Sequence, residues 1–253
     1  MRGEHCVLGA SALTFVSVIL LIFAHIGQIS SGPLVKSIYM AEVNVAAYGN
    51  GLAGATNTSA GGLYDSKDED MGKFKGLRQF YRFGMYNACG YQKDAASGIC
   101  NSSTFAYPME PLGSLIGDVP PQFRIQTVNI IPSSTFKQNG YNHAMTRAAS
   151  ALIFVGSVGV ALAFIFGVIK FRLTFFVASI CAGVGAFLLM IGAALWTAVV
   201  AKDAWLEKVT VQHGYKLGIY VTAGPSLYLV WVAFAMTALS CLPYVIACCT
   251  YRK

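Results

Sequence analysis

The composition of this 253-residue chain excludes an ordinary soluble domain, because 55% of its residues are hydrophobic and only 11% are charged. Soluble domains carry roughly 25% charged residues, so a lipid bilayer is the expected solvent. The net charge of +7 does not indicate nucleic-acid binding, since the basic residues are scattered and form no run interleaved with aromatic residues.

Four apolar runs predict four transmembrane helices. None of them contains Asp, Glu, Lys or Arg, and each exceeds the roughly 20 residues that a helix needs to cross the hydrocarbon core. Buried helices of a soluble protein are the alternative, and four uncharged runs argue against it. The runs are residues 6–29, 148–169, 173–201 and 223–249.

The first run, 6–29, could instead be a cleaved signal peptide, since Arg2 precedes it. It is longer than the typical apolar region of about 7 to 15 residues, and no clear small-x-small cleavage motif closes it. We therefore expect a retained membrane helix. Its His25 is the only residue of the four runs that could carry a charge. We expect a structural, hydrogen-bonded histidine, with a pH-sensing or ligand-contact role as the alternative.

The segments between the runs define the topology. Residues 30–147 separate the first two helices, whereas only 170–172 separate the second from the third. Alternation of sides places this turn with the two ends of the chain, 1–5 and 250–253, opposite both 30–147 and 202–222. Basic residues lie near both sides, so their distribution alone does not decide the orientation.

Two N-glycosylation sequons and a close cysteine pair indicate that segment 30–147 is extracellular. The sequons begin at Asn57 and Asn101, and the cysteines are Cys89 and Cys100. Both features belong to an oxidising, exocytoplasmic compartment. These cysteines are the only pair in the segment, so we expect a disulfide between them, with two free thiols as the alternative. The chain ends and the short turn are then cytoplasmic.

Within segment 30–147, the composition predicts an antiparallel sheet. Stretches rich in β-branched and aromatic residues are the candidate strands, and 216–221, before the fourth helix, could pair with them. Residues 113–122 are expected to connect strands, and the charged stretch 65–75, which follows a Gly- and Ala-rich stretch at 46–62, is expected to be mobile. The candidate strands are residues 37–45, 80–91, 99–107 and 124–131.

A cysteine motif carries a resemblance to a known superfamily. The chain reads Gly84-Met85-Tyr86-Asn87-Ala88-Cys89, and ten residues then separate Cys89 from Cys100. This resembles the claudin-superfamily signature Gly-Leu-Trp-x-x-Cys with a second cysteine about ten residues on, although Tyr86 stands where the signature has Trp. The spacing suits a hairpin, in which two strands bring the cysteines opposite each other.

The wider pattern resembles the fungal Sur-seven/PalI family within that superfamily. The segments that carry the resemblance are PLVKSIYM at 33–40, LRQFYRFG at 77–84 and FAYP at 105–108. The resemblance implies a claudin-like membrane protein, an all-α four-helix bundle with an extracellular antiparallel β-sheet. It also implies a place in furrow-like eisosome domains of the fungal plasma membrane, with effects on cell-wall organisation, endocytosis or ambient-pH signalling.

Small residues repeat along the second and third predicted helices. Such residues let helix backbones approach closely. Packing within the bundle is the first interpretation, and lateral association with another protein is the alternative. The residues are Gly159, Ala163 and Gly167 in the second helix, and Ala178, Ser179, Ala182, Gly183 and Ala186 in the third.

A second cysteine pair, Cys248 and Cys249, ends the fourth run beside Arg252 and Lys253. Cysteines next to basic residues at the cytoplasmic end of a membrane helix are typical sites of S-acylation. Two inert thiols are the alternative.

The sequence shows no recognisable pattern of catalytic or metal-binding residues. Residues 68–72 resemble part of a calcium loop but lack the third ligand position and the distant Glu, so a solvated charged loop is preferred. The spans also lack the charged residues that pumps and coupled transporters use. We therefore expect no enzymatic activity, no cofactor and no metal.

The function that these features favour is a non-enzymatic organiser of a fungal plasma membrane. Its expected partners are membrane lipids, lateral membrane proteins or further copies of itself, and not nucleic acid. The alternative is an auxiliary subunit of a larger membrane enzyme or channel, such as a cell-wall polysaccharide synthase. A small-solute channel or transporter ranks below both.

Overall fold

The structure, a computed structural model, describes residues 2–64, 69–93, 97–132, 135–169 and 171–250. The chain divides into two compact units, which are described separately. The helical unit comprises residues 1–25, 148–195 and 227–253, and the sheet unit comprises residues 26–147 and 196–226.

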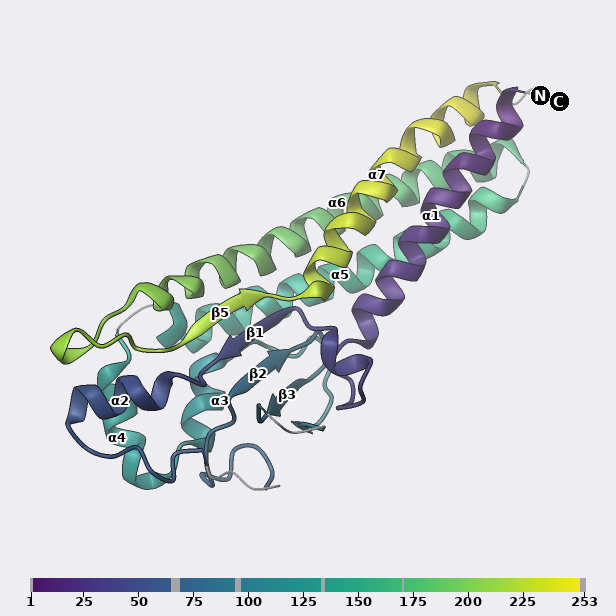
Figure 1. The fold of residues 1–253 in the computed structure, drawn as a ribbon. Helices are drawn as coiled ribbons and strands as arrows, with labels where there is room; N and C mark the ends of the chain where they lie inside the picture. The colour runs from purple at the N-terminus through teal and green to yellow at the C-terminus, as the bar shows by residue number, and fades with distance from the viewer. Residues whose placement is uncertain (1, 65–68, 94–96, 133–134, 170, 251–253) are drawn as a thin grey trace. The chain divides into compact units, whose positions relative to one another are not determined.

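The four apolar runs form four long helices, α1 (Arg2–Ile26), α5 (Asn139–Val168), α6 (Arg172–Asp203) and α7 (Pro225–Thr250), as Figure 1 shows. Each is long and apolar enough to cross a membrane, with mean hydropathy between 1.7 and 2.5. A helix pairs its backbone N–H and C=O groups within itself, which is required in lipid because lipid offers them no hydrogen-bond partners. The prediction of a multi-pass protein with four membrane helices is confirmed.

The ends of the helices differ from the ends of the apolar runs. Helix α1 stops at Ile26, short of residue 29, and Gln28 then takes a left-handed backbone conformation with φ of 59°. Helix α5 starts at Asn139, well before residue 148, so its first turns belong to the sheet unit. An apolar run shows which residues can lie in lipid. The ends of a helix depend instead on the residues that start or stop it, so the two boundaries differ.

A five-stranded antiparallel sheet, in the order β4-β3-β2-β1-β5, organises the sheet unit. In β1 buried and half-buried residues alternate, and Ala41 and Val43 have no exposed surface. The strands are β1 (Ala41–Asn44), β2 (Phe80–Phe83), β3 (Ala88–Tyr91), β4 (Ile99–Cys100) and β5 (Tyr220–Ala223).

Strand β5 links the segment between α6 and α7 to the segment between α1 and α5. It pairs with β1, with Val221 opposite Val43. The predicted antiparallel sheet and the predicted pairing of segment 216–221 with it are therefore confirmed, although the strand begins only at Tyr220. The candidate strand 80–91 divides into β2 and β3, and β4 occupies only the first two residues of candidate 99–107.

Among the described residues of the sheet unit are three short α-helices, α2 (Tyr48–Thr56), α3 (Pro111–Asp118) and α4 (Pro121–Ile130). The predicted strand at 124–131 is wrong, because all but its last residue lie in α4. Pro121 suits the first turn of a helix, and the buried Phe123 and Thr127, four residues apart, share one face.

The predicted connecting loop at 113–122 is also wrong. Pro111 begins α3, and Leu112 and Leu115 lie on its buried side. The charged stretch 65–75 falls partly outside the described residues, at 65–68. Its described part is tied to α3, since the backbone N–H of Phe74 donates to the carbonyl of Gly117 over 2.8 Å.

Candidate functional site

The cysteine motif forms a disulfide-closed hairpin, as predicted. Cys89 in β3 and Cys100 in β4 lie directly opposite each other and are bonded. Strand β4 has only two residues, and so short a strand gains little from pairing alone. The disulfide therefore holds this edge of the sheet in register.

The rest of the motif combines close packing with an exposed aromatic face. A Cβ on Gly84 would lie 2.5 Å from the carbonyl oxygen of Gly27, so only glycine fits there. Met85 is buried, whereas Tyr86 is half-buried, and burial raises the pKa of its hydroxyl. The Tyr86 ring lies 6.4 Å from that of Phe105.

These rings line a shallow hollow of about 390 Å³, the apolar hollow, which is formed by Ile29, Tyr86, Ser103, Thr104 and Phe105. Phe105 is 57% exposed and Ile29 is 46% exposed. Large apolar side chains grouped on a surface mark interaction sites more often than isolated ones do.

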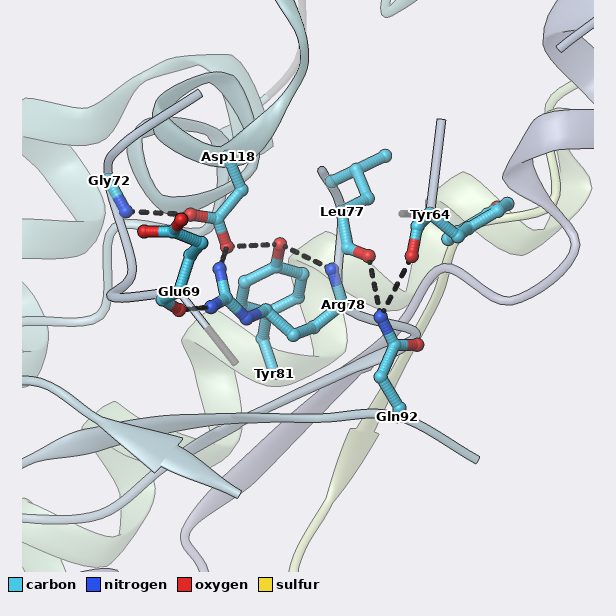
Figure 2. Close-up of polar contacts among 8 residues, drawn as sticks. All are labelled: Tyr64, Glu69, Gly72, Leu77, Arg78, Tyr81, Gln92 and Asp118. Carbon is cyan, nitrogen blue, oxygen red and sulfur yellow. Dashed lines mark hydrogen bonds and ion pairs between the residues drawn. The ribbon is translucent and has the colours of Figure 1, made fainter. Parts of the chain in front are cut away.

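A buried ion pair joins Arg78 and Asp118 in the sheet unit (Figure 2). The Arg78 guanidinium is 2.9 Å from the Asp118 carboxylate, and both side chains are at most 2% exposed. Asp118 also accepts a hydrogen bond from the Tyr81 hydroxyl at 2.7 Å and one from the backbone N–H of Gly72 at 2.6 Å. Arg78 also donates to the backbone carbonyl of Glu69.

The members of this network bind one another. Burial, together with the Asp118 carboxylate, raises the pKa of Tyr81 well above its ordinary value, so its hydroxyl remains a donor. The polar groups of Arg78, Tyr81 and Asp118 contact one another, and all three side chains are buried. An unpaired charge at this buried position would be strongly unfavourable. The ion pair therefore holds the segment 69–78 in a defined position against α3.

Sequence reasoning missed this network. In the sequence, Arg78 is only one residue of the segment 77–84 that carries the family resemblance, and Asp118 falls in the stretch 113–122 that is predicted to connect strands. The available signal was weak: Asp118 ends an apolar helical turn in which Leu112 and Leu115 face inward. Nothing local pairs it with an arginine forty positions earlier.

A second polar cluster surrounds Gln28, just after α1. Its two amide N–H groups point to the carbonyl oxygens of Val35, Lys36 and Ile38, which lie 2.9 to 3.1 Å from the nitrogen, and its amide oxygen accepts from the Tyr91 hydroxyl at 2.9 Å. One buried side chain thus satisfies an entire turn of backbone.

Arg82 makes an ion pair within the sheet, with Glu42 on the neighbouring strand at 2.6 Å. Its guanidinium lies over the rings of Tyr39 and Tyr91, 4.8 and 5.1 Å from their centroids. The Arg82 side chain is 22% exposed and that of Glu42 is 13% exposed, so this ion pair is more solvated than the pair of Arg78 with Asp118.

A comparison of the sequence with known protein families agrees with the four membrane helices and the disulfide-closed hairpin. The sequence profile of the SUR7/PalI family matches residues 6–251, nearly the whole chain and both units. The chain belongs to the SUR7/PalI family. No significant match was found among curated proteins.

The two sequons of this SUR7/PalI protein differ in their surroundings. Asn57 is exposed and ends α2 in a left-handed conformation with φ of 52°. Asn101 is half-buried, and its amide nitrogen, the atom that a glycan would occupy, donates to the Tyr107 hydroxyl at 2.8 Å. Glycosylation remains a prediction, and this geometry favours Asn57.

The small residues of α5 and α6 have different neighbours. Ala163, Ala178 and Ala182 lie in one buried cluster with Ala10 and Tyr244. A Cβ on Gly159 would lie 3.2 Å from the Cα of Gly185, and one on Gly167 would collide with Tyr244. Ala186 is buried and Ser179 is half-buried.

Gly183 differs from the other small residues, because nothing lies within 4 Å of the position of its Cβ and it is exposed. Sequence spacing also missed Gly156 of α5, whose added Cβ would lie 3.1 Å from the carbonyl oxygen of Gly185. The backbones of α5 and α6 therefore approach closely at Gly156, Gly159 and Gly185, and again at Gly192, whose added Cβ would lie 2.9 Å from the carbonyl oxygen of Ala149, but not at Gly183.

His25 lies in α1, where its Nε2 is 2.9 Å from the Ser157 hydroxyl. Its ring meets that of Phe154 edge-on, with centroids 6.1 Å apart. This hydrogen bond is what the structural interpretation of His25 requires. The side chains of Cys248 and Cys249, the predicted acylation sites, lie outside the described residues.

Over the residues that the structure describes, no group of three His, Cys, Asp or Glu side chains could hold a metal ion. Asp68, the first residue of the calcium-like segment, is outside that part of the chain. Glu110 and His143 make a close acid–histidine contact in the sheet unit, at 2.5 Å, and both side chains are more than one-third exposed.

Proposed function

We propose that this SUR7/PalI protein is a non-enzymatic organiser of a fungal plasma membrane, working in an eisosome-like domain that is linked to cell-wall organisation and endocytosis. It acts by lateral contacts with membrane proteins and lipids. The observation that carries this proposal is the apolar hollow, which presents Phe105 and Ile29 to the surroundings beside the family motif.

The proposed orientation has the sheet unit outside the cell. The disulfide between Cys89 and Cys100 supports it, since such bonds persist in oxidising compartments. The accessible sequon at Asn57 agrees with the same side.

The proposal that the protein has no enzymatic activity rests on the contacts of its buried ionisable groups. Arg78, Asp118 and Tyr81 are occupied with one another and are closed to solvent. A general acid or base must instead reach a substrate within hydrogen-bond distance.

An auxiliary subunit of a larger membrane enzyme or channel is the second candidate, because the same hollow could seat one large partner. Purification in mild detergent followed by quantitative mass spectrometry separates the two functions. An organiser should bring down copies of itself, several proteins and lipid, whereas an auxiliary subunit should bring down one large partner at fixed stoichiometry.

A matched pair of variants ties this result to the hollow. Phe105→Ser should weaken the association, while Ile125→Ser, which alters a 75% exposed side chain of α4 outside the hollow, should not. Recovery of bare monomer from wild type would contradict both functions. Equal recovery with both variants would show that the contact lies elsewhere.

A further inference from the structure

A second cavity of the sheet unit, of about 410 Å³, lies among α2, α4 and the segment 209–212. Figure 1 shows α2 and α4 in the same part of this unit. It belongs neither to the family motif nor to the Arg78 network. We call it the amide cavity after its polar lining, which consists of Thr56, Gln126, Asn129, Thr210 and Gln212.

The chemistry of this lining is neutral throughout. Three carboxamides and two hydroxyls provide both donors and acceptors, and none of the described lining residues is charged. Phosphate, carboxylate or a metal cation would call for an opposite charge in such a site. Apolar side chains, including Ile130 and Val209, provide the remaining wall. A ligand that suits these walls carries many hydroxyls and apolar C–H faces.

One acceptor in the cavity lacks a partner. The Oε1 atom of Gln126 is buried and has no hydrogen-bond partner among the described residues. A buried acceptor left unsatisfied is unfavourable, and a rotation of the half-buried Gln126 side chain, which lines the cavity, would bring this oxygen to a ligand hydroxyl. Asn129 and Gln212, which also line the cavity, are exposed, so their amides are accessible to a ligand.

An aromatic ring lies beside the cavity. Tyr215 packs on α2, where a Cβ on Gly54 would lie 2.5 Å from its ring, and the next two residues of α2, Ala55 and Thr56, line the cavity. The backbone N–H of Val211, another lining residue, donates to the carbonyl of Tyr215 at 2.7 Å. Tyr215 is 53% exposed, so its amphipathic ring is accessible to a ligand.

We propose that the amide cavity binds a neutral saccharide chain, with Gln126 and Gln212 as hydrogen-bonding residues and Tyr215 as the surface for a sugar ring. This inference extends the proposed function, since it assumes that the sheet unit faces a polysaccharide. The same chemistry has two sources, a free wall-type glycan or the protein's own glycan on Asn57, which directly follows Thr56.

The test is a titration of full-length protein in detergent with neutral hexasaccharides of glucose and N-acetylglucosamine, followed by calorimetry or ligand-observed NMR. Saturable binding is expected at concentrations up to about 5 mM. Gln126→Leu and Gln212→Ala should each weaken it about tenfold. Gln122→Leu, an exposed amide of α4 outside the lining, should leave it unchanged. A hexamer of galacturonate should not bind.

The two sources separate with Asn57→Gln. Equal binding by glycosylated wild type and Asn57→Gln identifies a free glycan as the ligand. Binding only after loss of the Asn57 glycan identifies the attached glycan as the occupant.

Absence of saturable binding in both proteins, or binding that neither Gln126→Leu nor Gln212→Ala changes, would overturn the proposal. Gln212 is exposed, so its variant keeps the test valid even where Gln126→Leu does not fold. Binding in detergent is independent of membrane orientation and lateral partners, so this result stands apart from the copurification test.

Discussion

The helical unit and the sheet unit are stabilised by different interactions. The described core of the helical unit relies on small side chains, such as Ala163, Ala178 and Ala182, and on a few hydroxyl contacts, such as Thr14 with Tyr244 at 3.1 Å. The sheet unit encloses a full ion pair and a disulfide. Lipid gives helices little hydrophobic drive to associate, so close packing dominates in one unit. In the other, water drives apolar burial and can solvate whatever charge is exposed.

This difference predicts where single substitutions act most strongly. Losing a buried partner in the sheet unit leaves a charge or a donor unsatisfied, whereas changing a small residue in the helical unit alters van der Waals contact. The following variants test that contrast, from the largest expected effect on stability to the smallest.

Asp118→Leu should destabilise the sheet unit by about 3 to 5 kcal/mol, because it leaves the buried Arg78 charge without its partner. Hydrogen exchange and urea denaturation in nanodiscs would measure the loss. The double variant Arg78→Met, Asp118→Leu should recover much of it, since no unpaired charge remains. Glu42→Gln, in the more solvated Arg82 pair, should lose about 1 kcal/mol. Equal effects of Asp118→Leu and Glu42→Gln would contradict the larger contribution assigned to the fully buried pair.

Replacing Cys89 and Cys100 together by Ser should destabilise the sheet unit by roughly 3 kcal/mol, because the closed loop no longer restricts the unfolded chain. The pairing of β4 with β3 should loosen as well, because a strand of two residues gains little from pairing alone. Non-reducing peptide mapping of the mature protein supplies the control. A free thiol at either position would end the assignment.

High pH should weaken the sheet unit through its buried tyrosines. Burial raises the pKa of Tyr64 to about 12 from an ordinary value of 10. The unfolded chain therefore loses this proton first, so the contribution is complete below pH 10 and is lost as pH rises to 12. Two pKa units correspond to at most about 3 kcal/mol, less for a partly exposed ring. Tyr64→Phe should flatten this part of the pH–stability curve, and an unchanged curve would contradict the assignment.

Glycan removal should have the smallest effect on stability. Asn57→Gln should abolish the glycosidase-sensitive mobility shift of protein made in its own host, while Asn101→Gln should leave it, because Asn101 is held by Tyr107. Stability should change by less than about 0.5 kcal/mol, as Asn57 is exposed. A shift that depends on Asn101 would reverse the order of the two sites.

Sequence reasoning succeeds where the signal is local and fails where it is not. The membrane helices follow from continuous apolar runs, and the disulfide from two cysteines in one segment. The strand expected at 124–131 fails because β-branched composition does not outweigh a proline that starts a helix at Pro121. The Arg78 to Asp118 pair is unreadable because only tertiary structure joins residues that far apart.

The helix-packing residues show the same limit on a smaller scale. A four-residue repeat of small residues places them on one face but not against a given neighbour. The repeat therefore included Gly183, which has nothing within 4 Å of its Cβ position, and omitted Gly156, which contacts Gly185. The amide cavity was missed for the same reason, since α2, α4 and segment 209–212 are distant in sequence.

The proposal of lateral association is tested most directly by cross-linking in native membranes with Gly159→Leu and Gly183→Leu. Gly159 packs against α6 within the chain, so leucine there should reduce the amount of folded protein. Gly183 is exposed, so leucine there should leave the fold and the surface expression intact while removing higher-mass cross-linked species. If the Gly183→Leu protein cross-links as the wild type does, or the wild type yields monomer alone, lateral association through this face is contradicted.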